Sequence, residues 1–391
     1  MHILFYRYGS ICEPDVIDAF QELGHTVEEI CEEITNKTLT PQESIRIVNA
    51  HLQTHPADCI FSINFFPFLA EVCNIYHIRY LSWIVDSPVM ELYSTSITQP
   101  WNRTFLFDYA LYQEFVQLNP NCIFHLPLAA NIKSKHAAIA SATSTDKQRF
   151  TCEISFVGSL YTEKCPYDKL QGASPFLTGY LDGIMNAQMQ VYGYYFIEEL
   201  LKDSMVEEFK AHMPGFFQYP AKSYLTDKVT MSQLYIGNKI TALERLATMR
   251  VLSENFNTTI FTGSDTSTLP KLINKGLAKS LTEMPIIFNN SKINLNTTSK
   301  PIRSGLPQRI WDIMGSGGFV LSNYQSEIPE LFKIGEHLDV YGSLEELKEK
   351  CEFYLTHENE RHEITMTGFE EVKQNHTFVI RLEQLIKLAF T

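Results

Sequence analysis

Short apolar strands alternate with amphipathic helices along the first third of the chain, and this alternation limits the fold more than any other feature. Residues 2–8, HILFYRY, are typical of a buried strand, and residues 13–24 carry apolar side chains at helical spacing before a glycine. Residues 40–43, TPQE, form a capping box with proline at the first helical position. Buried strands that are connected by helices form a parallel sheet with helices on both faces. The sequence therefore predicts an α/β, doubly wound domain.

The same alternation returns in the second half of the chain. We expect strands at EISFV, TTIF, PIIFN, KINLN, GFVLS and LDVYG, and helices over residues 176–213 and 230–255. A chain of 391 residues is too long for one ordinary core and is suited to two. The pattern therefore predicts two doubly wound domains, the second with a helical insertion.

Changes of pattern along the chain predict the domain boundaries. We expect a Rossmann-like domain over residues 1–132 and a linker over residues 133–150, which are polar, rich in Ala and Ser, and without periodicity. The second domain is expected over residues 151–375 with its helical layer at residues 171–255, and a C-terminal helix over residues 376–391. Ligands of such sheets bind at the carboxyl ends of the strands, so we expect the two domains to face a central cleft.

Charge and cysteine content exclude several classes of function. The net charge of −13 is inconsistent with a nucleic-acid-binding protein, because such proteins neutralise phosphates with basic patches. The eight cysteines are scattered singly without a CxxC motif, as is usual for reduced thiols in the cytoplasm. The first apolar run contains an arginine and suits a strand, not a signal peptide, and no run is long enough to cross a bilayer. We expect a cytoplasmic protein without a transmembrane segment; the sequence leaves a homo-oligomer open.

The stretch NLNTTSKPIRSGLPQRIWDIMGSGGFVLS holds the densest group of candidate ligand-binding residues. Asn294 and Asn296 alternate with apolar residues on a predicted strand, and the bases Lys300, Arg303 and Arg309 follow before or within the next helix. Basic residues beside a helix N-terminus suit an anion such as a diphosphate. A cation in the first turn of a helix is unfavourable unless an anion is present, which favours Arg309 as a phosphate ligand.

Asp312 lies on the helix that follows these bases. A carboxylate accepts both hydroxyl protons of a ribose diol, so we predict that Asp312 binds the ribose of a nucleotide, with Gln308 one turn before it. The glycine-rich turn at residues 315–318 is expected to let the backbone approach the ligand.

Three glycine turns directly follow apolar strands. Gly158-Ser159 is a candidate for binding phosphate or sugar through backbone N–H groups, and Thr262-Gly263 is a candidate for contact with the nucleobase. Residues 9–10 form a third turn, in the first domain, where we expect a second substrate to bind that accepts the transferred group through a hydroxyl. Ordinary turns at strand ends are the alternative for all three.

Asp86 ends the predicted strand YLSWIV, where a general base for an acceptor hydroxyl should lie. A capping or turn aspartate is the alternative for Asp86, and Asp108 is a second candidate for the base, whereas His125 is expected in the core or at a hinge. No D-x-D occurs, and a divalent ion that bridges a diphosphate usually needs paired carboxylates. We therefore expect no metal and no cofactor, and predict that the basic residues stabilise the leaving diphosphate.

Several of these segments together resemble the CgeB-type, spore-maturation-protein-like bacterial glycosyltransferases of the GT-B fold. The matching motifs are YLSWIVDSP, FLFDYALY, HLPLAAN, ISFVGSLYTE, GYLDGIMNAQMQVYGY and IRSGLPQRIWDIMGSGGFVLSNY. The resemblance implies a nucleotide-sugar donor, expected to be a UDP-sugar, bound mainly by the C-terminal domain with Asp312 at the ribose. It implies an acceptor bound mainly by the N-terminal domain. Many retaining members carry a glutamate where this chain has Ser304, which leaves the stereochemistry open.

The predicted function is transfer of a sugar from a nucleotide diphosphate sugar to a hydroxyl of a polysaccharide or protein glycan. A nucleotide-sugar epimerase or hydrolase on the same fold is one alternative, but it would need acid/base carboxylates in both domains, and only Asp86 is clearly placed. A catalytically lapsed binding or assembly protein is the other, suggested by Ser304.

Overall fold

The computed structural model of the protein describes residues 1–163 and 165–391 and contains two six-stranded parallel sheets in two compact units. The first unit comprises residues 1–129, 219–225 and 375–391, and the second comprises residues 130–218 and 226–374. The predicted α/β fold with two doubly wound sheets is confirmed.

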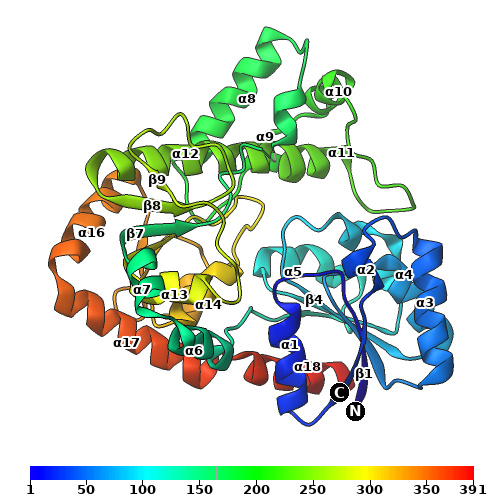
Figure 1. Ribbon diagram of the computed structural model, residues 1–391. Coiled ribbons are helices and arrows are strands. Elements are labelled where there is room, and N and C mark those ends of the chain that lie inside the picture. The colour runs from blue at the N-terminus through cyan, green and yellow to red at the C-terminus, as the bar shows by residue number, and fades with distance from the viewer. Residues whose placement is uncertain (164) are drawn as a thin grey trace. The chain divides into compact units, whose positions relative to one another are not determined.

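The sheet of the first unit has the strand order β2-β1-β3-β4-β5-β6. Its central strand β3 is buried along its whole length, as expected for a parallel sheet with helices on both faces. Helices α1 and α18 pack together on one face, and α3 and α4 pack together on the other (Figure 1). The elements of this unit are β1 (His2–Tyr6), α1 (Glu13–Glu22), β2 (Thr26–Ile30), α2 (Glu32–Thr35), α3 (Pro41–Thr54), β3 (Cys59–Ile63), α4 (Pro67–Tyr76), β4 (Arg79–Ile84), β5 (Asn102–Leu106), α5 (Tyr109–Phe115), β6 (Ile123–His125) and α18 (Phe378–Phe390).

The sheet of the second unit has the strand order β12-β11-β10-β7-β8-β9. Helices α12 and α16 pack together on one face, and α13, α14 and α6 pack together on the other (Figure 1). The sheet and its helices are α6 (Ile132–Ser141), α7 (Ser144–Phe150), β7 (Cys152–Val157), α12 (Gly237–Asn255), β8 (Thr258–Phe261), β9 (Ile273–Asn274), α13 (Met284–Asn290), β10 (Ser291–Asn296), α14 (Gln308–Gly315), β11 (Val320–Asn323), α15 (Ile328–Leu331), β12 (Asp339–Tyr341), α16 (Leu344–Thr356) and α17 (Glu358–Asn375).

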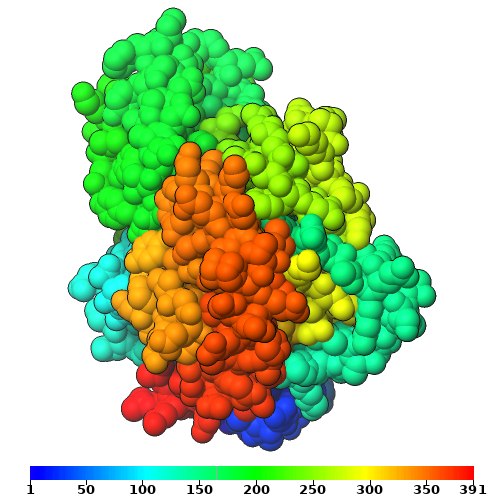
Figure 2. All heavy atoms as spheres, turned by 90° about the vertical axis from the view of Figure 1, so that its left-hand side faces the viewer, coloured from blue at the N-terminus to red at the C-terminus, as the bar shows by residue number. Residues whose placement is uncertain are grey.

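A helical layer with an apolar core of its own lies between β7 and β8 in the sequence. Its core includes Leu181, Phe209, Met231 and Tyr235, all buried. In the space-filling view this layer, coloured green, extends beyond the orange surface of α16 and α17 (Figure 2). The layer consists of α8 (Pro175–Gln188), α9 (Ile197–Leu200), α10 (Asp203–His212), α11 (Asp227–Val229) and a π-helical stretch η5 (Thr230–Ile236), which continues into α12.

Two local predictions are wrong. Residues 133–150, expected to be a linker, form α6 and α7 and belong to the second unit. The side chains of Asn131 and Thr143 cap these two helices, and the alanines between them have high helix propensity. Residues 285–289, PIIFN, expected to be a strand, lie in helix α13, because Pro285 stands in its first turn and a short apolar run suits a buried helix equally well.

The C-terminal helix and a segment of the second half complete the first unit. The ring of Phe378 at the start of α18 lies 5.7 Å from that of Trp83, and Arg103 donates a hydrogen bond to the carbonyl of Ala389 at 3.2 Å. The backbone of Tyr224 pairs with that of Tyr93 at 2.8 Å. No helix in the described part of the chain has the length and apolarity that a membrane span needs, and none of the eight cysteines forms a disulfide.

Candidate functional site

The strand order of each sheet identifies the edge where a ligand can bind. In the second unit the chain proceeds from β7 outward to β8 and β9, and from β10 outward in the opposite direction to β11 and β12. The topological switch point therefore lies between β7 and β10, and ligands of doubly wound sheets bind at the carboxyl ends of the strands there. Those ends carry Gly158-Ser159 and the loop at residues 297–305, both of which the sequence singled out.

The turns after β7 and β8 are fixed to each other by side-chain hydroxyls. The Oγ of Ser264 accepts a hydrogen bond from the backbone N–H of Leu160 at 2.8 Å, and Thr262 Oγ1 accepts one from the N–H of Ser264 at 3.1 Å. Ser159 Oγ accepts one from the N–H of Tyr161 at 2.7 Å, which holds that residue at a left-handed φ of 65°. These turns form a defined surface at the carboxyl edge. Gly263 is exposed there, and a Cβ on this residue would lie 3.4 Å from the side chain of Leu277.

Asn294 and Asn296 lie on the same side of β10, and both are buried. Asn294 is buried, accepts a hydrogen bond from Ser155 Oγ at 2.8 Å and donates to two backbone carbonyls at 2.9 and 3.2 Å. Asn296, at the end of the strand, donates to Ser322 Oγ at 2.9 Å. Asn296 also donates to Thr298 Oγ1 at 3.0 Å, so protein groups use the side-chain N–H donors of both asparagines, and Asn296 in addition connects the carboxyl ends of two neighbouring strands.

Lys300 lies in the loop at the switch point, but its charge is directed toward helix α12. Its Nζ is 3.3 Å from the Oε2 of Glu244 and 4.7 Å from the ring centre of Tyr192. The Lys300 side chain is 9% exposed and that of Glu244 is 3% exposed, so the ion pair is buried. Burial raises the pKa of the Glu244 carboxyl above its ordinary value.

The remainder of the loop is held by the residues that follow β11. Ser304 donates a hydrogen bond to Glu327 Oε1 at 2.7 Å, and both residues are buried. Gln325 donates to the carbonyls of Ile302 and Gly305 at 3.2 and 3.3 Å. These bonds fix the backbone on both sides of Arg303, which is half-buried.

Gln308, Arg309 and Asp312 lie together on the first turns of α14. The Nε2 of Gln308 donates to Asp312 Oδ1 at 3.1 Å, and Arg309 Nη1 lies 3.8 Å from Asp312 Oδ2. Lys135, which the sequence did not single out, lies closest to this carboxylate, with its Nζ 2.9 Å from Asp312 Oδ1. The segment that holds Lys135 looked like a linker, so no sequence signal indicated this pair.

The glycine-rich turn at residues 315–318 does not approach the ligand edge, which corrects our prediction. This turn precedes β11 and therefore lies at the amino end of the strand. Gly317 has a φ of 69°, and the turn ends α14 with hydrogen bonds back to the helix carbonyls. A Cβ on Gly318 would lie 2.6 Å from the carbonyl oxygen of Phe288 and 2.8 Å from Asn294 Nδ2. The glycine is thus required for packing.

Gly318→Ala is expected to lower the free energy of unfolding by about 1–3 kcal/mol, because the added methyl group overlaps backbone that cannot move freely. Urea denaturation measures the change. Gly183→Ala in α8 is the matched control, since no atom lies within 4 Å of its Cβ position. That control should be neutral or stabilising by up to about 1 kcal/mol. Equal stabilities of the two variants would refute the packing role of Gly318.

A polar cluster lies at the switch point of the first unit, between β1 and β3. Asn64 follows β3 at a left-handed φ of 59°, a conformation that asparagine tolerates better than most residues. Its Nδ2 donates to Asp86 Oδ2 at 2.7 Å and lies 2.8 Å from the Tyr8 hydroxyl, and that hydroxyl is 3.4 Å from Asp86 Oδ2. Burial, followed by the charge of Asp86, raises the pKa of Tyr8, so the phenol stays protonated.

A buried carboxylate, that of Glu13, fixes the turn at residues 9–10. Glu13 is fully buried and accepts hydrogen bonds from the N–H groups of Tyr8 and Gly9 at 2.9 and 3.0 Å. Arg7 Nε pairs with the same carboxylate at 3.0 Å. Tyr8, Glu13 and Asn64 belong to no sequence motif, so no pattern along the chain indicated them.

Asp108 and His125, the other residues weighed for proton transfer, have local partners. Asp108 is buried and caps helix α5 by accepting the N–H of Leu111 at 3.2 Å. The ring of His125 contacts that of Tyr109 at 5.2 Å. Asp86, by contrast, is exposed at the carboxyl end of β4.

Residues 245–387 match the glycosyl transferase-like family, and this stretch includes the loop at residues 297–305 and α14. No curated protein sequence matches the chain. The match supports the prediction that the protein is a glycosyltransferase; the narrower CgeB-type assignment stays a prediction.

Several solved structures are similar to this chain over nearly its whole length. Anabaena HepE in complex with UDP and glucose aligns at 12% identity with a TM-score of 0.53, covering 99% of this chain and 98% of that one. A glycosyltransferase from Rickettsia africae ESF-5 aligns at 10% identity with a TM-score of 0.57, covering 99% and 97%. Sucrose-phosphate synthase from Thermosynechococcus elongatus aligns at 10% identity with a TM-score of 0.54, covering 100% and 99%. These similarities confirm the GT-B fold.

Proposed function

We propose that this protein transfers a sugar from a UDP-sugar to a hydroxyl group of a glycan or protein acceptor. The observation that carries the proposal is the switch point of the second unit, where the loop after β10 leads directly into α14 with the carboxylate of Asp312 and its neighbouring bases Lys135 and Arg309. The match to a glycosyl transferase-like family over residues 245–387 supports it. So does HepE, a protein of the same fold whose structure contains UDP and glucose.

On the donor side, each group has a distinct task. Asp312 accepts the ribose hydroxyls, and Gln308 orients its carboxylate. Arg303, Arg309 and the N-terminus of α14 stabilise the negative charge that develops on the leaving diphosphate, because cations and helix N–H groups both attract anions. Lys300 is neutralised by its buried pair with Glu244, so its task is to hold the loop that carries Arg303.

On the acceptor side, Asp86 is the proposed general base. Asn64 donates to Oδ2 of Asp86, which orients the carboxylate and leaves Oδ1 to accept the proton of an acceptor hydroxyl. This step belongs to an inverting reaction. In a retaining reaction the departing phosphate accepts the proton, and Asp86 positions the acceptor.

The proposal also includes a metal-independent reaction, a cytoplasmic location and membership of the CgeB-type family. The separate cysteines support the location, since reduced thiols are typical of that compartment. The basic residues near Asp312 support the metal-independent reaction, because they supply positive charge at the diphosphate.

Nucleotide binding tests the proposal directly. UDP at 100 times its dissociation constant should stabilise the protein by about 2.7 kcal/mol, and uridine should have a much smaller effect. Release of UDP from a UDP-sugar should require an acceptor and should persist in excess EDTA. Release without any acceptor would indicate a hydrolase. If no nucleoside diphosphate stabilises the protein, the proposal is wrong.

A further inference from the structure

Helix α12 directs one arginine into the switch point of the second unit. The Nη1 of Arg245 donates a hydrogen bond to the carbonyl of Ser159 at 2.6 Å, and its Nη2 donates to the carbonyl of Thr297 at 2.7 Å. Ser159 follows β7 and Thr297 follows β10, the two strands that flank the switch point. One guanidinium group thus connects the two loops between which a ligand of this sheet is expected.

The guanidinium group is itself fixed by aromatic rings. Its central carbon lies 4.7 Å from the ring centre of Tyr161 and 5.4 Å from that of Phe156, both from the β7 segment. A planar group with donors on two sides can bridge two carbonyls while it stacks on a ring. A lysine ammonium group lacks this planar fork, so the site is specific for arginine.

Two further residues of α12 hold the same loop. Thr241 Oγ1 accepts a hydrogen bond from the backbone N–H of Lys300 at 3.0 Å, and Glu244 pairs with the Lys300 side chain. Together with Arg245, they attach the loop after β10 to one helix at successive positions. The loop after β7 is attached to that helix through Arg245.

We propose that Arg245 is a positioning residue of the donor site, which sets the separation of the β7 and β10 loops so that both contact the diphosphate sugar. This inference rests on the proposed function and adds a residue to it that lies outside the predicted ligand set. Since a displacement of about 1 Å can cost 100-fold in rate, loss of the bridge should reduce donor binding and turnover by about 10- to 100-fold.

The decisive variant is Arg245→Met, which keeps much of the side-chain volume and removes both bridging donors. We expect a UDP dissociation constant about 10- to 100-fold higher by calorimetry, a higher donor KM and an unchanged acceptor KM. Arg245→Lys should lie between Met and wild type, because its donors sit on one nitrogen and cannot match the two separated nitrogens of the guanidinium fork. A UDP affinity within twofold of wild type in Arg245→Met would overturn the proposal.

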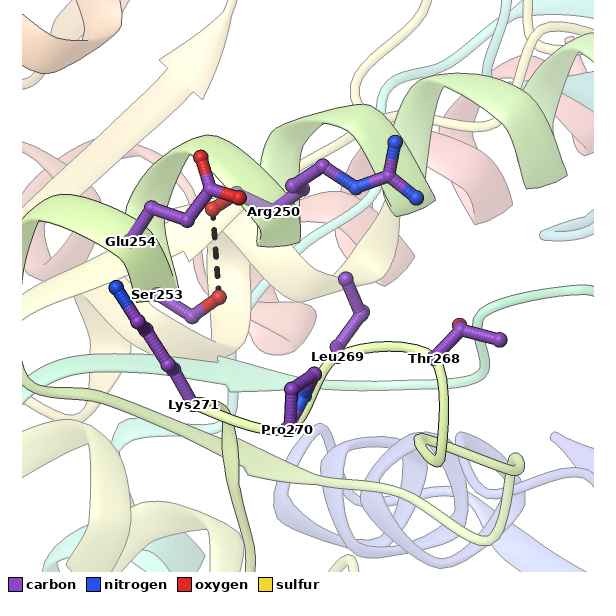
Figure 3. A pocket seen from close by; sticks show the side chains of 7 residues that line it. All are labelled: Arg250, Ser253, Glu254, Thr268, Leu269, Pro270 and Lys271. Atoms are coloured by element: carbon purple, nitrogen blue, oxygen red, sulfur yellow. Dashed lines mark hydrogen bonds between the residues drawn. The ribbon is translucent and has the colours of Figure 1, made fainter.

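Arg250→Met is the matched control on the same helix. Arg250 is exposed and lines, with Ser253 and Glu254, a small cavity of about 90 Å³ against residues 268–271 (Figure 3). Among the described residues its side chain makes no hydrogen bond to either loop of the switch point, so this variant should bind UDP as wild type does. A similar loss of UDP affinity in both variants would show that lost positive charge causes the effect. It would refute the positioning role of Arg245.

Hydrogen exchange separates this inference from the proposed function. In Arg245→Met the amides of residues 158–161 and 297–300 should exchange at least about tenfold faster than in wild type without any ligand. The exchange result does not depend on UDP. Absence of UDP binding by the wild-type protein would refute the proposed function and leave the bridge by Arg245 intact. Unchanged exchange in both loops would refute the bridge; if Arg245→Met does not fold, Arg245→Lys carries the same test.

Discussion

Replacement of Asp86 by asparagine is expected to lower turnover by about 10²–10⁴-fold, the usual contribution of a general base. The amide oxygen of asparagine can still accept the hydrogen bond that Asn64 donates at 2.7 Å, so the geometry of the cluster should survive. The substitution removes the capacity to take a proton. UDP affinity should stay at the wild-type value, because Asp86 and the predicted donor residues belong to different units.

Kinetics of this variant should be combined with NMR assignment of the product's anomeric configuration. Inversion together with near wild-type turnover would exclude Asp86 as the base. Retention with a raised acceptor KM would instead indicate that Asp86 binds the acceptor. Asp108→Asn is the matched control, because asparagine caps helices as well as aspartate does and α5 should keep its N-cap.

Asp312→Ala is expected to have two separate effects, both large. Donor binding should weaken by about 1–3 kcal/mol, because ribose hydroxyls lose a charged acceptor. The free energy of unfolding should fall by about 3–5 kcal/mol, because the buried Lys135 would lose its ion pair with Asp312. The exposed fractions support this second effect: Lys135 is 7% exposed and Asp312 is 15% exposed.

The double variant Lys135→Met/Asp312→Ala distinguishes the two effects. Removal of both charges should restore much of the lost stability, as measured by urea denaturation, since no uncompensated ion remains. UDP affinity should stay low, because the ribose ligand is still missing. Wild-type UDP affinity in the double variant would show that Asp312 has only a structural role.

The sequence predicted the elements whose signals are local. Alternating apolar runs identified β1, β3 and β4, and the capping box at residues 40–43 identified the start of α3. Composition and periodicity of a segment depend only on its own residues, so the doubly wound class followed from the sequence. The basic loop and Asp312 were also visible, because their residue types lie within a few positions of each other.

Local signals failed where two structures suit the same residues. The apolar run at residues 285–289 is too short for its periodicity to distinguish a strand from a helix. The segment at residues 133–150 lacks an apolar stripe, yet its caps and alanines form α6 and α7. The glycines at residues 315–318 suit both a ligand loop and close packing, and only the position of the turn at the amino end of β11 excluded the first.

The contacts that shape the candidate sites were decided by the tertiary structure alone. Arg245 bonds residues 86 positions before it and 52 positions after it in the sequence, and Asn64 is 22 positions from Asp86. No single segment contains such a pair, so no pattern along the chain indicates it. The parallel sheets bring the turns that carry Asn64 and Asp86 to one edge, and helices packed in the second unit bring Arg245 and Lys135 to residues that the sequence by itself had identified.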